Sequence, residues 1–488
     1  MNVLWAHDHT FYFNESGKFF SGGKLPYAVW ERYLGVFDKI TVAGRGKKAS
    51  SDADMAGKTL SSGPNVDFLV LPSLSNPVNK MTKRGYIEQL LQEAIGKADA
   101  VIARVPSEIG AEAIRVARRM GKPYAVEVVA CAWDGLWNYG NLQGKLYAPF
   151  SLNQTRAIVK DAPYALYVTE KFLQQRYPNI GGRTESCSNV EIPEPGEEVL
   201  TRRLERLQAM STDAPLTIGL IGSLNGRTKG IDIALRAIAK AKPNLPATKF
   251  RVLGDGDPAR WQAMAEKLGI GSLVSFEGVL PSGGAVFEWL DNIDLYVQPS
   301  YQEGLPRATI EAMSRACPVL GSTAGGIPEL IHESCLHRPG QVNQLAEQIK
   351  RATFDRRWLK EQAERNFGRS KQFTKQRLDA KRTAFWQSFG EMVGQISLRE
   401  VAAGAEPVRE EMSEHNETPA VSTNAANTST GVEASTTAST TANANTTAST
   451  TANANANTTA STNTTANAST NTNTEASTNE SRERVGAI

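Results

Sequence analysis

The chain has 488 residues, of which 40% are apolar and 22% charged, and its formal net charge is +3. Residues 401–488 hold nine Glu and three Arg, a net of −6, so the first 400 residues carry +9. About 400 residues of ordinary globular composition predict two or three domains. The +9 is dilute and forms no basic stripe interleaved with aromatic residues, which argues against a nucleic-acid partner. Weak attraction to an anionic membrane surface stays open.

The segments that would mark a membrane or secreted protein are missing from the sequence. No run approaches the ~18 consecutive apolar residues that a membrane-spanning helix needs. The N-terminus MNVLWAHDHT has no basic region before its apolar residues and is typical of a first strand, not of a signal peptide. The four cysteines, which form no C-x-x-C pair, are Cys131, Cys187, Cys317 and Cys335. They indicate neither a disulfide framework nor a zinc site and favour the cytoplasm.

From residue 1 to about 190, short apolar runs alternate with helical patterns. The expected strands are Asn2–His7, Ile40–Ala43, Asp67–Leu71, Ala100–Val105, Tyr124–Ala130 and Tyr164–Thr169. The expected helices between them are Leu25–Val36, Arg84–Lys97, Glu108–Met120 and Gln154–Lys160. Strands that alternate with helices of this length predict βαβ crossovers and a parallel sheet.

The alternation restarts after a segment rich in Pro, Gly and Glu, Glu191–Val199, which is typical of a linker. The next expected strands are Thr217–Gly222, Lys249–Leu253, Val274–Phe276, Asp294–Gln298 and Pro318–Ser322. The expected helices are Lys229–Lys240, Pro258–Leu268, Ala308–Arg315 and Val342–Ala352, followed by a long charged helical pattern over Asp355–Phe389. This second alternation predicts a second α/β domain.

The sequence therefore predicts an α/β protein with two Rossmann-like domains that face a central cleft, because ligands of open parallel sheets bind beyond the carboxyl ends of the strands. The expected division is a first domain over residues 1–190, a linker over 191–213, a second domain over 214–370, a bracing helix over 371–400 and a tail over 401–488. The Ala/Asn/Ser/Thr-rich tail is expected to be disordered, because it has too little apolar surface to form a core. Triplets such as Asn427–Ser429 would alternatively fit a glycosylated stalk.

The stretch Glu303–Glu329, EGLPRATIEAMSRACPVLGSTAGGIPE, is the most informative segment. A Gly/Pro loop that begins at Glu303 follows an expected strand, and the next helix carries Glu311. Two carboxylates beside one crevice suit a polyol, because carboxylates accept strong hydrogen bonds from hydroxyl groups. Gly-rich turns and helix starts present free N–H groups to phosphate oxygens. A Glu near a helix start can also serve only the helix dipole.

The E-x7-E spacing within EGLPRATIEAMSRACPVLGSTAGGIPELI resembles the signature of retaining glycosyltransferases of family 4, which have the GT-B fold. Four further segments are similar to motifs of that family: GSLNGRTKGID (Gly222–Asp232), VLGDGD (Val252–Asp257), VSFEGVL (Val274–Leu280) and SNV (Ser188–Val190). In the first domain, SGGKLPYAVW (Ser21–Trp30) resembles the glycine-rich loop that faces the acceptor. The resemblance covers about residues 1–390 and is most specific in the second half.

The resemblance implies a role for individual residues. Glu303 would contact the hydroxyls of the donor sugar, Lys229 would neutralise the diphosphate leaving group, and Glu311 would bind the ribose. The remaining donor-binding candidates are Gly222, Ser223, Arg227, Gly278, Val279, Leu280, Gly304, Leu305, Pro306 and Arg307. The acceptor-side candidates are Gly22, Gly23 and Asp134, with His7 and Asp8 nearby.

The sequence departs from the family at two positions. Ser223 stands where the family often has an Arg after the first glycine, and Arg227 or Arg307 could supply the missing charge. The expected acceptor-domain strand runs into EVVACAWD (Glu127–Asp134) without the family's usual His. The first departure concerns donor binding and the second concerns the acceptor.

The implied mechanism needs no metal and no cofactor beyond a nucleotide diphosphate sugar as co-substrate. Fixed cations and N–H groups aimed at the departing diphosphate would stabilise the transition state, an effect worth roughly 3–4 kcal/mol for each well-placed donor. GDG at Gly254–Gly256 is too short for a metal clamp. His7–His9 could ligate a metal, but no third ligand is apparent.

Two other groups of residues have alternative interpretations. The aromatic residues Trp133, Trp137, Tyr139 and Tyr147 could stack on acceptor sugars or simply anchor loops. Arg115, Arg118, Arg119 and Lys122 could face a membrane, although an ordinary solvated helix face fits them better.

The sequence favours a cytoplasmic glycosyltransferase that moves a sugar onto a glycan or lipid-linked glycan in surface polysaccharide biosynthesis, with possible peripheral contact at the inner face of a membrane. A different GT-B activity, such as a nucleotide-sugar epimerase, is the first alternative. The second alternative is an inactive carbohydrate-binding scaffold.

Overall fold

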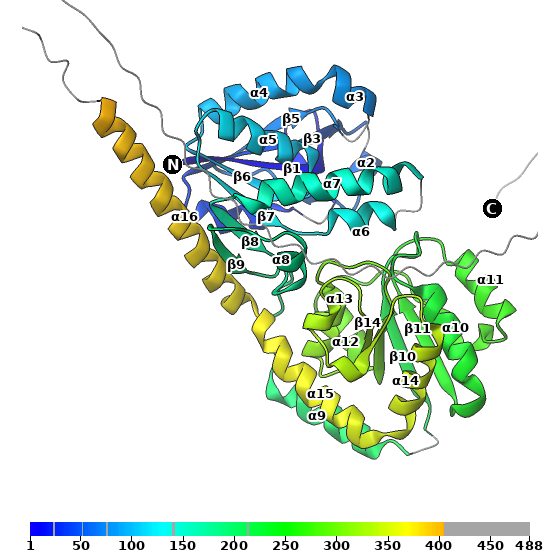
Figure 1. The fold of residues 1–488 in the computed structure, drawn as a ribbon. Coiled ribbons are helices and arrows are strands. Elements are labelled where there is room, and N and C mark those ends of the chain that lie inside the picture. Colours follow the sequence, from blue (N-terminus) through cyan, green and yellow to red (C-terminus); the bar gives the residue numbers. More distant parts are fainter. Residues whose placement is uncertain (23–24, 51, 75–76, 139–141, 212–213, 405–488) are drawn as a thin grey trace, which may run out of the picture. The chain divides into compact units, whose positions relative to one another are not determined.

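A computed structural model describes residues 1–22, 25–50, 52–74, 77–138, 142–211 and 214–404. These residues belong to one compact unit, Met1–Arg409. Residues 405–488 of the expected tail, Gly23 of the acceptor-side candidates and Tyr139 of the aromatic group lie outside the described residues, whereas residues 401–404, also expected in the tail, are helical. The unit contains two parallel sheets, each with helices on its faces (Figure 1).

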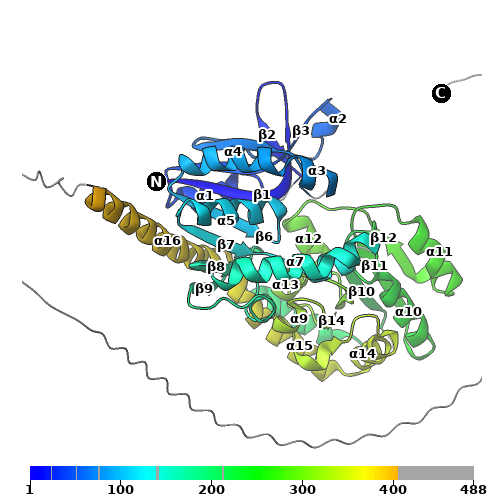
Figure 2. The same cartoon turned by 45° about the horizontal axis from the view of Figure 1, so that its top comes forward.

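The first sheet is built from the N-terminal half of the unit. Its strands are β1 (Asn2–Phe13), β2 (Phe19–Ser21), β3 (Lys39–Lys48), β4 (Thr59–Leu60), β5 (Val66–Leu71), β6 (Ala100–Val105), β7 (Tyr124–Val128), β8 (Tyr164–Tyr167) and β9 (Arg183–Ser186). The parallel strands lie in the order β5-β3-β1-β6-β7-β8-β9, and β2 and β4 add an antiparallel extension beside the end of β1. This extension projects with α2 (Asp52–Met55) beyond the rest of the sheet (Figure 2). The strand order reverses between β1 and β6.

The other N-terminal helices are α1 (Tyr27–Leu34), α3 (Pro77–Thr82), α4 (Arg84–Gly96), α5 (Glu108–Arg119), α6 (Ala132–Trp137), α7 (Leu142–Lys160) and α8 (Phe172–Arg176). Helix α5 shows why these segments form helices. The Ser107 hydroxyl accepts the Gly110 N–H at 2.9 Å and caps the start, and two arginines complement the dipole at the end. Its apolar face, including Ile109, Ile114 and Val116, is buried.

The second sheet has the strands β10 (Leu216–Ile221), β11 (Thr248–Leu253), β12 (Val274–Phe276), β13 (Leu295–Gln298), β14 (Val319–Ser322) and β15 (Leu336–His337). All are parallel, in the order β12-β11-β10-β13-β14-β15, which reverses between β10 and β13. Its helices are α9 (Glu197–Ala209), α10 (Ile231–Ala241), α11 (Ala259–Lys267), α12 (Gly284–Asp291), α13 (Arg307–Ser314), α14 (Val342–Phe354) and α15 (Arg356–Ser370). We call these elements the donor half, after the role that the sequence resemblance implies for them, and the first sheet with its helices the N-terminal half.

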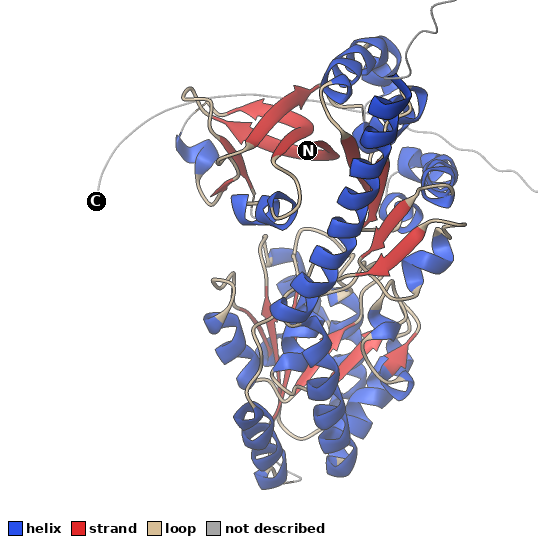
Figure 3. Ribbon diagram, turned by 90° about the vertical axis from the view of Figure 1, so that its left-hand side faces the viewer, coloured by secondary structure: helices blue, strands red, loops and turns tan. Residues whose placement is uncertain are grey.

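Helix α16 (Lys375–Gly404) follows the donor half in sequence but packs on the N-terminal half, beside β8 and β9 (Figures 1 and 3). The Tyr164 hydroxyl on β8 donates to the Ser388 carbonyl at 2.9 Å, and Trp386 is fully buried. The two segments that connect the halves meet at a parallel bridge between Ile192 and Thr374. The chain therefore passes between the halves twice at one place.

Most expected elements are present, and the differences have physical causes. Strands β6 and β12 have the bounds that the sequence predicts. Strand β1 runs past His7 to Phe13 because β3 and β2 continue to pair with it. The motif Ser188–Val190 resembles the family's strand before the linker, but here the strand is Arg183–Ser186, which pairs with β8. Helix α9 occupies much of the segment expected as a linker, and α15 and α16 divide the long helical pattern.

Candidate active site

Glycine residues bring the loops at the carboxyl end of the donor-half sheet close together. Gly230 has φ +69°, and a Cβ at this position would lie 2.0 Å from the Pro299 carbonyl oxygen. The loop after β13 also bonds to the loop after β10, because the Tyr301 N–H donates to the Thr228 carbonyl at 2.8 Å. These two loops follow the strands at which the strand order reverses, the usual ligand position in open parallel sheets.

The Glu303 carboxylate lies in a dense network between these loops. Its Oε1 accepts from Lys229 Nζ at 2.8 Å, Gln298 Nε2 at 3.0 Å and Ser300 Oγ at 2.7 Å, and its Oε2 is 3.0 Å from the same Lys229 nitrogen. The Tyr296 hydroxyl donates in turn to the Gln298 amide oxygen at 2.6 Å. Glu303 is only 8% exposed. The sequence predicts Glu303 and Lys229 as site residues, and the structure places them in direct contact.

The side chains of Gln298 and Ser300 were missed by the sequence reasoning. Both follow from position, because polar residues at the carboxyl end of a buried strand at a reversal of strand order face the ligand site. The motif QPSYQEG holds them beside Glu303. They fix the direction of the Glu303 carboxylate.

Glu311, eight residues after Glu303, is a buried carboxylate of a different kind. It lies in α13 and is 9% exposed, and its carboxylate accepts no hydrogen bond from the described residues. Burial raises the pKa of Glu311, and the Arg307 charge one turn earlier lowers it in part. A buried acceptor without a protein partner is costly unless a ligand satisfies it.

The glycine pair Gly325–Gly326 supports the loop that carries Glu303. Gly325 has φ +58°, and a Cβ there would lie 2.0 Å from the Glu303 carbonyl oxygen. The Gly326 N–H donates to the Gly304 carbonyl at 2.7 Å. Glu303 is thus followed by a turn, Gly304–Pro306, which is supported by the glycine pair and leads into α13.

The other donor-side candidates have varied surroundings. Arg227 is 71% exposed and forms an ion pair of 2.6 Å with Asp232, whereas Arg307 is exposed and has no ion pair within the described part of the chain. The Ser223 hydroxyl accepts weakly from the Asn225 N–H at 3.4 Å.

Two glycines shape the rest of the donor-side loops. Gly222 is in close contact with Lys229, because a Cβ on the glycine would lie 2.6 Å from the lysine Cγ. Gly278 has φ +69° and accepts from the Gly254 N–H at 2.6 Å, with Val279 exposed and Leu280 half-buried beside it.

In the N-terminal half the strand order reverses between β1 and β6, and the polar groups there have other roles than those in the donor half. His7–His9 form a bulge, since β1 advances four residues from Ala6 to Thr10 while β3 advances two. Asp8 accepts the Glu108 and Ile109 N–H groups at 2.5 and 3.2 Å and so holds the start of α5. Burial raises the pKa of Asp8 and lowers that of His7 to about 3. In the described residues no cluster of three or more His, Cys, Asp or Glu could hold a metal ion.

Asp134 lies next to the donor-side loop. Its Oδ1 is 3.3 Å from Arg176 Nη2 on α8. With the Gln302 amide oriented to match its neighbours, Gln302 donates to the Asp134 carbonyl at 3.0 Å and accepts from the Gly135 N–H at 3.2 Å. The expected acceptor-side residue Asp134 therefore contacts Gln302, which precedes Glu303 in the chain. Gly22, the other described acceptor-side candidate, is exposed at the end of β2.

Comparison with known proteins places this site in a family. The family model described as "Glycosyl transferases group 1" matches residues 215–355, which lie in the donor half. Protein CapJ of Staphylococcus aureus is 32% identical over 362 residues, which cover 74% of this chain and 88% of that protein. The Vi polysaccharide biosynthesis protein VipC/TviE of Salmonella typhi is 34% identical over 144 residues, covering 29% of this chain and 24% of its own length.

A solved structure shows the same fold over both halves. HepE of Anabaena, determined in complex with UDP and glucose, has a TM-score of 0.51 and 15% identity, and covers 83% of this chain and 100% of its own. The chain has the GT-B fold that the sequence resemblance implies. The chain belongs to the group 1 glycosyl transferases.

Proposed function

We propose that this glycosyltransferase moves a sugar, with retention of anomeric configuration as in family 4, from a nucleotide diphosphate sugar to a glycan or lipid-linked glycan. The named role of VipC/TviE in Vi polysaccharide biosynthesis supports a polysaccharide as the product. We propose that it is a surface polysaccharide, made at the cytoplasmic side of a membrane. The UDP and glucose bound by HepE support a nucleotide sugar as donor. Residues 1–190 would bind the acceptor and residues 214–370 the donor.

One observation carries the proposal: of the two buried carboxylates in the E-x7-E pair, one is hydrogen-bonded by protein side chains and the other is not. Glu303 is fixed by Lys229, Gln298 and Ser300, whereas Glu311 has no partner among the described residues. A fixed carboxylate suits the hydroxyls of a sugar, because its direction is set before binding. An unpartnered buried carboxylate suits the ribose hydroxyls, which would satisfy it on binding.

The proposed reaction is the one that retention of configuration implies. The bond between the anomeric carbon and the phosphate oxygen breaks as the acceptor hydroxyl attacks from the same face. The acceptor proton goes to the leaving phosphate oxygen, so no protein base and no metal is needed in this scheme. Lys229 would lie between the sugar and the phosphate, and its ammonium would stabilise the negative charge that develops on the leaving group.

We further propose that Arg307, rather than Arg227, supplies the charge missing at Ser223. Arg227 is already paired with Asp232, while Arg307 lies at the first residue of α13 and lowers the pKa of Glu311 electrostatically. Of these two arginines, Arg307 is therefore the one that has no ion pair among the described residues and could bind a phosphate.

The test is Glu303→Gln, with Glu347→Gln as a control because Glu347 is an exposed carboxylate on α14 paired with Lys350 at 2.9 Å. We expect the kcat for sugar transfer to fall about 10²–10³-fold in Glu303→Gln, since a preorganised charge is lost at the reacting sugar. The control should keep wild-type kcat. Unchanged turnover in Glu303→Gln would contradict the proposal, and an inverted product anomer in an NMR spectrum would exclude retention.

The peripheral membrane contact is proposed for the α6–α7 segment. The candidate basic residues on and after α5 are already engaged, since Arg115 and Arg119 pair with Glu88, Arg118 bonds to the Tyr124 hydroxyl and Lys122 bonds to the Ala98 carbonyl. No helix in the described residues is long and apolar enough to cross a membrane.

The α6–α7 segment instead combines exposed apolar groups with positive charge. The exposed fractions of Leu142, Leu146 and Phe150, one turn apart along α7, are 73%, 73% and 54%, and that of Trp137 is 43%. Residues 135–160 contain three Lys or Arg and no Asp or Glu. Exposed aromatic and aliphatic side chains with cations suit the surface of an anionic bilayer. This segment also includes Gly135, which is next to the donor-side loop, so a lipid-linked acceptor bound there would be near the site.

A further inference from the structure

The segment after β8 and the segment after Gly325–Gly326 are joined by a contact between the two halves. The backbone N–H groups of Glu170, Lys171 and Phe172 donate to the Glu329 carboxylate at 2.6, 3.0 and 2.6 Å. Both carboxylate oxygens are used. Hydrogen bonds to an ionised carboxylate are stronger than those between neutral groups, so three of them make a specific attachment.

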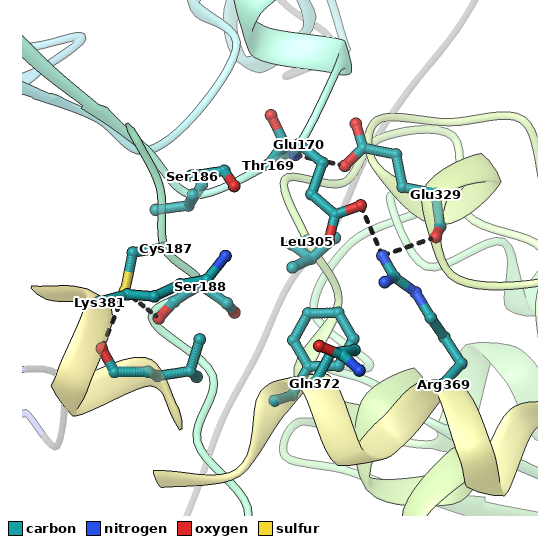
Figure 4. A pocket seen from close by; sticks show the side chains of 13 residues that line it. Thr169, Glu170, Ser186, Cys187, Ser188, Leu305, Glu329, Arg369, Gln372 and Lys381 are labelled. Atoms are coloured by element: carbon teal, nitrogen blue, oxygen red, sulfur yellow. Dashed lines mark hydrogen bonds and ion pairs between the residues drawn. The ribbon is translucent and has the colours of Figure 1, made fainter. Parts of the chain in front are cut away.

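An ion pair reinforces this contact from a third element. Arg369 on α15 donates to Glu170 Oε2 at 2.7 Å and to the Glu329 carbonyl at 3.2 Å. Figure 4 shows the side chains of Glu170, Glu329 and Arg369 pointing toward one another beside Leu305, at the edge of a small cavity. We call Glu329, Arg369 and residues 170–172 the latch.

The latch is continuous with the loop that carries Glu303. Gly326, three residues before Glu329, lies close to both halves. A Cβ at this position would lie 2.9 Å from the Gly304 carbonyl oxygen in the donor half and 3.2 Å from Thr169 Cγ2 in the N-terminal half. The glycine pair holds the backbone of Glu303 and Gly304, as described above. A movement of residues 169–172 relative to Glu329 would therefore act on the Glu303 loop through direct contacts.

We propose that Glu329 is a positioning residue that holds the N-terminal half against the Glu303 loop, so that the acceptor side and the donor sugar are aligned for transfer. This inference rests on the proposed role of Glu303 at the donor. Glu329 touches no substrate in this scheme. Its loss leaves the bonds of Glu303 to Lys229, Gln298 and Ser300 available but removes the contact that aligns the N-terminal half with the Glu303 loop.

The experiment compares Glu329→Ala and Glu329→Gln with Glu333→Gln in the full chain. Glu333 is the matched control, because it is an exposed carboxylate four residues later that bonds to no residue of the latch. In both Glu329 variants we expect kcat to fall by at least about tenfold, while the Kd of the donor nucleotide changes less than about twofold. A loss of folding would weaken nucleotide binding as well, so the split between kcat and Kd separates positioning from a general structural role.

A distance measurement tests the latch without turnover. Spin labels at Ile180→Cys and Phe354→Cys, side chains that are 63% and 57% exposed in the N-terminal and donor halves, report the separation of the halves. We expect a broader distribution of distances in Glu329→Ala than in the wild type or in Glu333→Gln. An unchanged distribution, or a kcat within about twofold of wild type in both Glu329 variants, would overturn the inference.

The two measurements also separate this inference from the proposed function. A wild-type chain that transfers no sugar to any tested acceptor contradicts the proposed function. The distance distribution then still decides whether Glu329 joins the halves. A broadened distribution together with a normal kcat in Glu329→Ala contradicts the positioning role alone.

Discussion

The two halves of the molecule each bury a carboxylate beneath the carboxyl ends of their strands, and the two carboxylates are in opposite situations. Glu127 on β7 is 4% exposed, accepts the Tyr33 hydroxyl at 2.6 Å and bonds to Arg104 Nε at 2.8 Å. Glu311 on α13 is 9% exposed and has no partner within the described residues. Burial is similar, but only one of the two carboxylates is satisfied by the protein itself.

This difference shows how a buried charge with a structural role differs from one available to a ligand. Glu127 completes a network that includes a buried Arg, so removing it leaves an uncompensated charge. The burial of Glu311 is unfavourable, is offset in part by the Arg307 charge, and would be relieved by a bound hydroxyl group. The same substitution to Gln should therefore have opposite effects on stability in the two halves.

The largest effect is expected for Glu127→Gln. This change leaves the Arg104 guanidinium buried beside a neutral amide, so the free energy of unfolding should fall by about 3 kcal/mol or more. Denaturant unfolding followed by fluorescence measures it, and the Kd of the donor nucleotide for the folded variant should stay near the wild-type value. A loss of less than about 1 kcal/mol would mean that the network around Glu127 is not structural.

Glu311→Gln should stabilise the fold and weaken nucleotide binding. Because burial raises the pKa of Glu311, the ionised group destabilises the folded state at neutral pH. This penalty disappears as the pH falls through the raised pKa, because the folded protein then takes up a proton more readily than the unfolded chain.

Thermal melts of Glu311→Gln and wild type at neutral and mildly acidic pH test whether the substitution stabilises the fold. The gain in Tm should be greatest at neutral pH and shrink toward acidic pH, and a nucleotide titration should show weaker binding at neutral pH. A variant that is less stable than wild type at neutral pH would show that Glu311 has a favourable partner in the absence of ligand.

The smallest effect concerns the surface of the N-terminal half. Leu146→Asp places a charge on the exposed apolar face of α7 and should weaken binding to phosphatidylglycerol vesicles about tenfold, since the burial of one Leu is lost. Leu398→Asp is the control, because Leu398 on α16 is 72% exposed and lies outside the α6–α7 segment. Vesicle co-sedimentation measures both variants. Equal binding by both would show that α7 does not face the bilayer, and a change in oligomeric state would indicate a protein partner instead.

The sequence predicts the fold best where its pattern is undisturbed. Strand β6 and strand β12 are short apolar runs with clear ends, and their bounds agree with the prediction. Helix α7 was expected only from Gln154 onward, because Gly144 and Pro149 interrupt the pattern and its outer face is apolar. The bulge at His7–His9 likewise hides the continuation of β1, since its polar residues end the apolar run without ending the strand.

For the candidate site, too, only features that depend on a local sequence pattern could be predicted. Glu303, Lys229 and Glu311 follow from a local motif and its resemblance to a family. Gln298 and Ser300 could be inferred only from the order of the strands, and the contact of Glu329 with residues 170–172 joins segments more than 150 residues apart. No local pattern in the sequence indicates which backbone groups that carboxylate would meet.

The bridge between the two connecting segments has a consequence for how such proteins can be recombined. The Ile192 N–H donates to the Phe373 carbonyl at 3.1 Å, and the Lys375 N–H donates to the Ile192 carbonyl at 2.9 Å. The segments through which the chain enters and leaves the donor half are thus hydrogen-bonded to each other, and the sequence between them is one continuous cassette. A cassette from a relative could be exchanged through two neighbouring junctions, which offers a direct route to hybrid enzymes. Under the proposed division of roles, such hybrids would keep one acceptor and accept another donor.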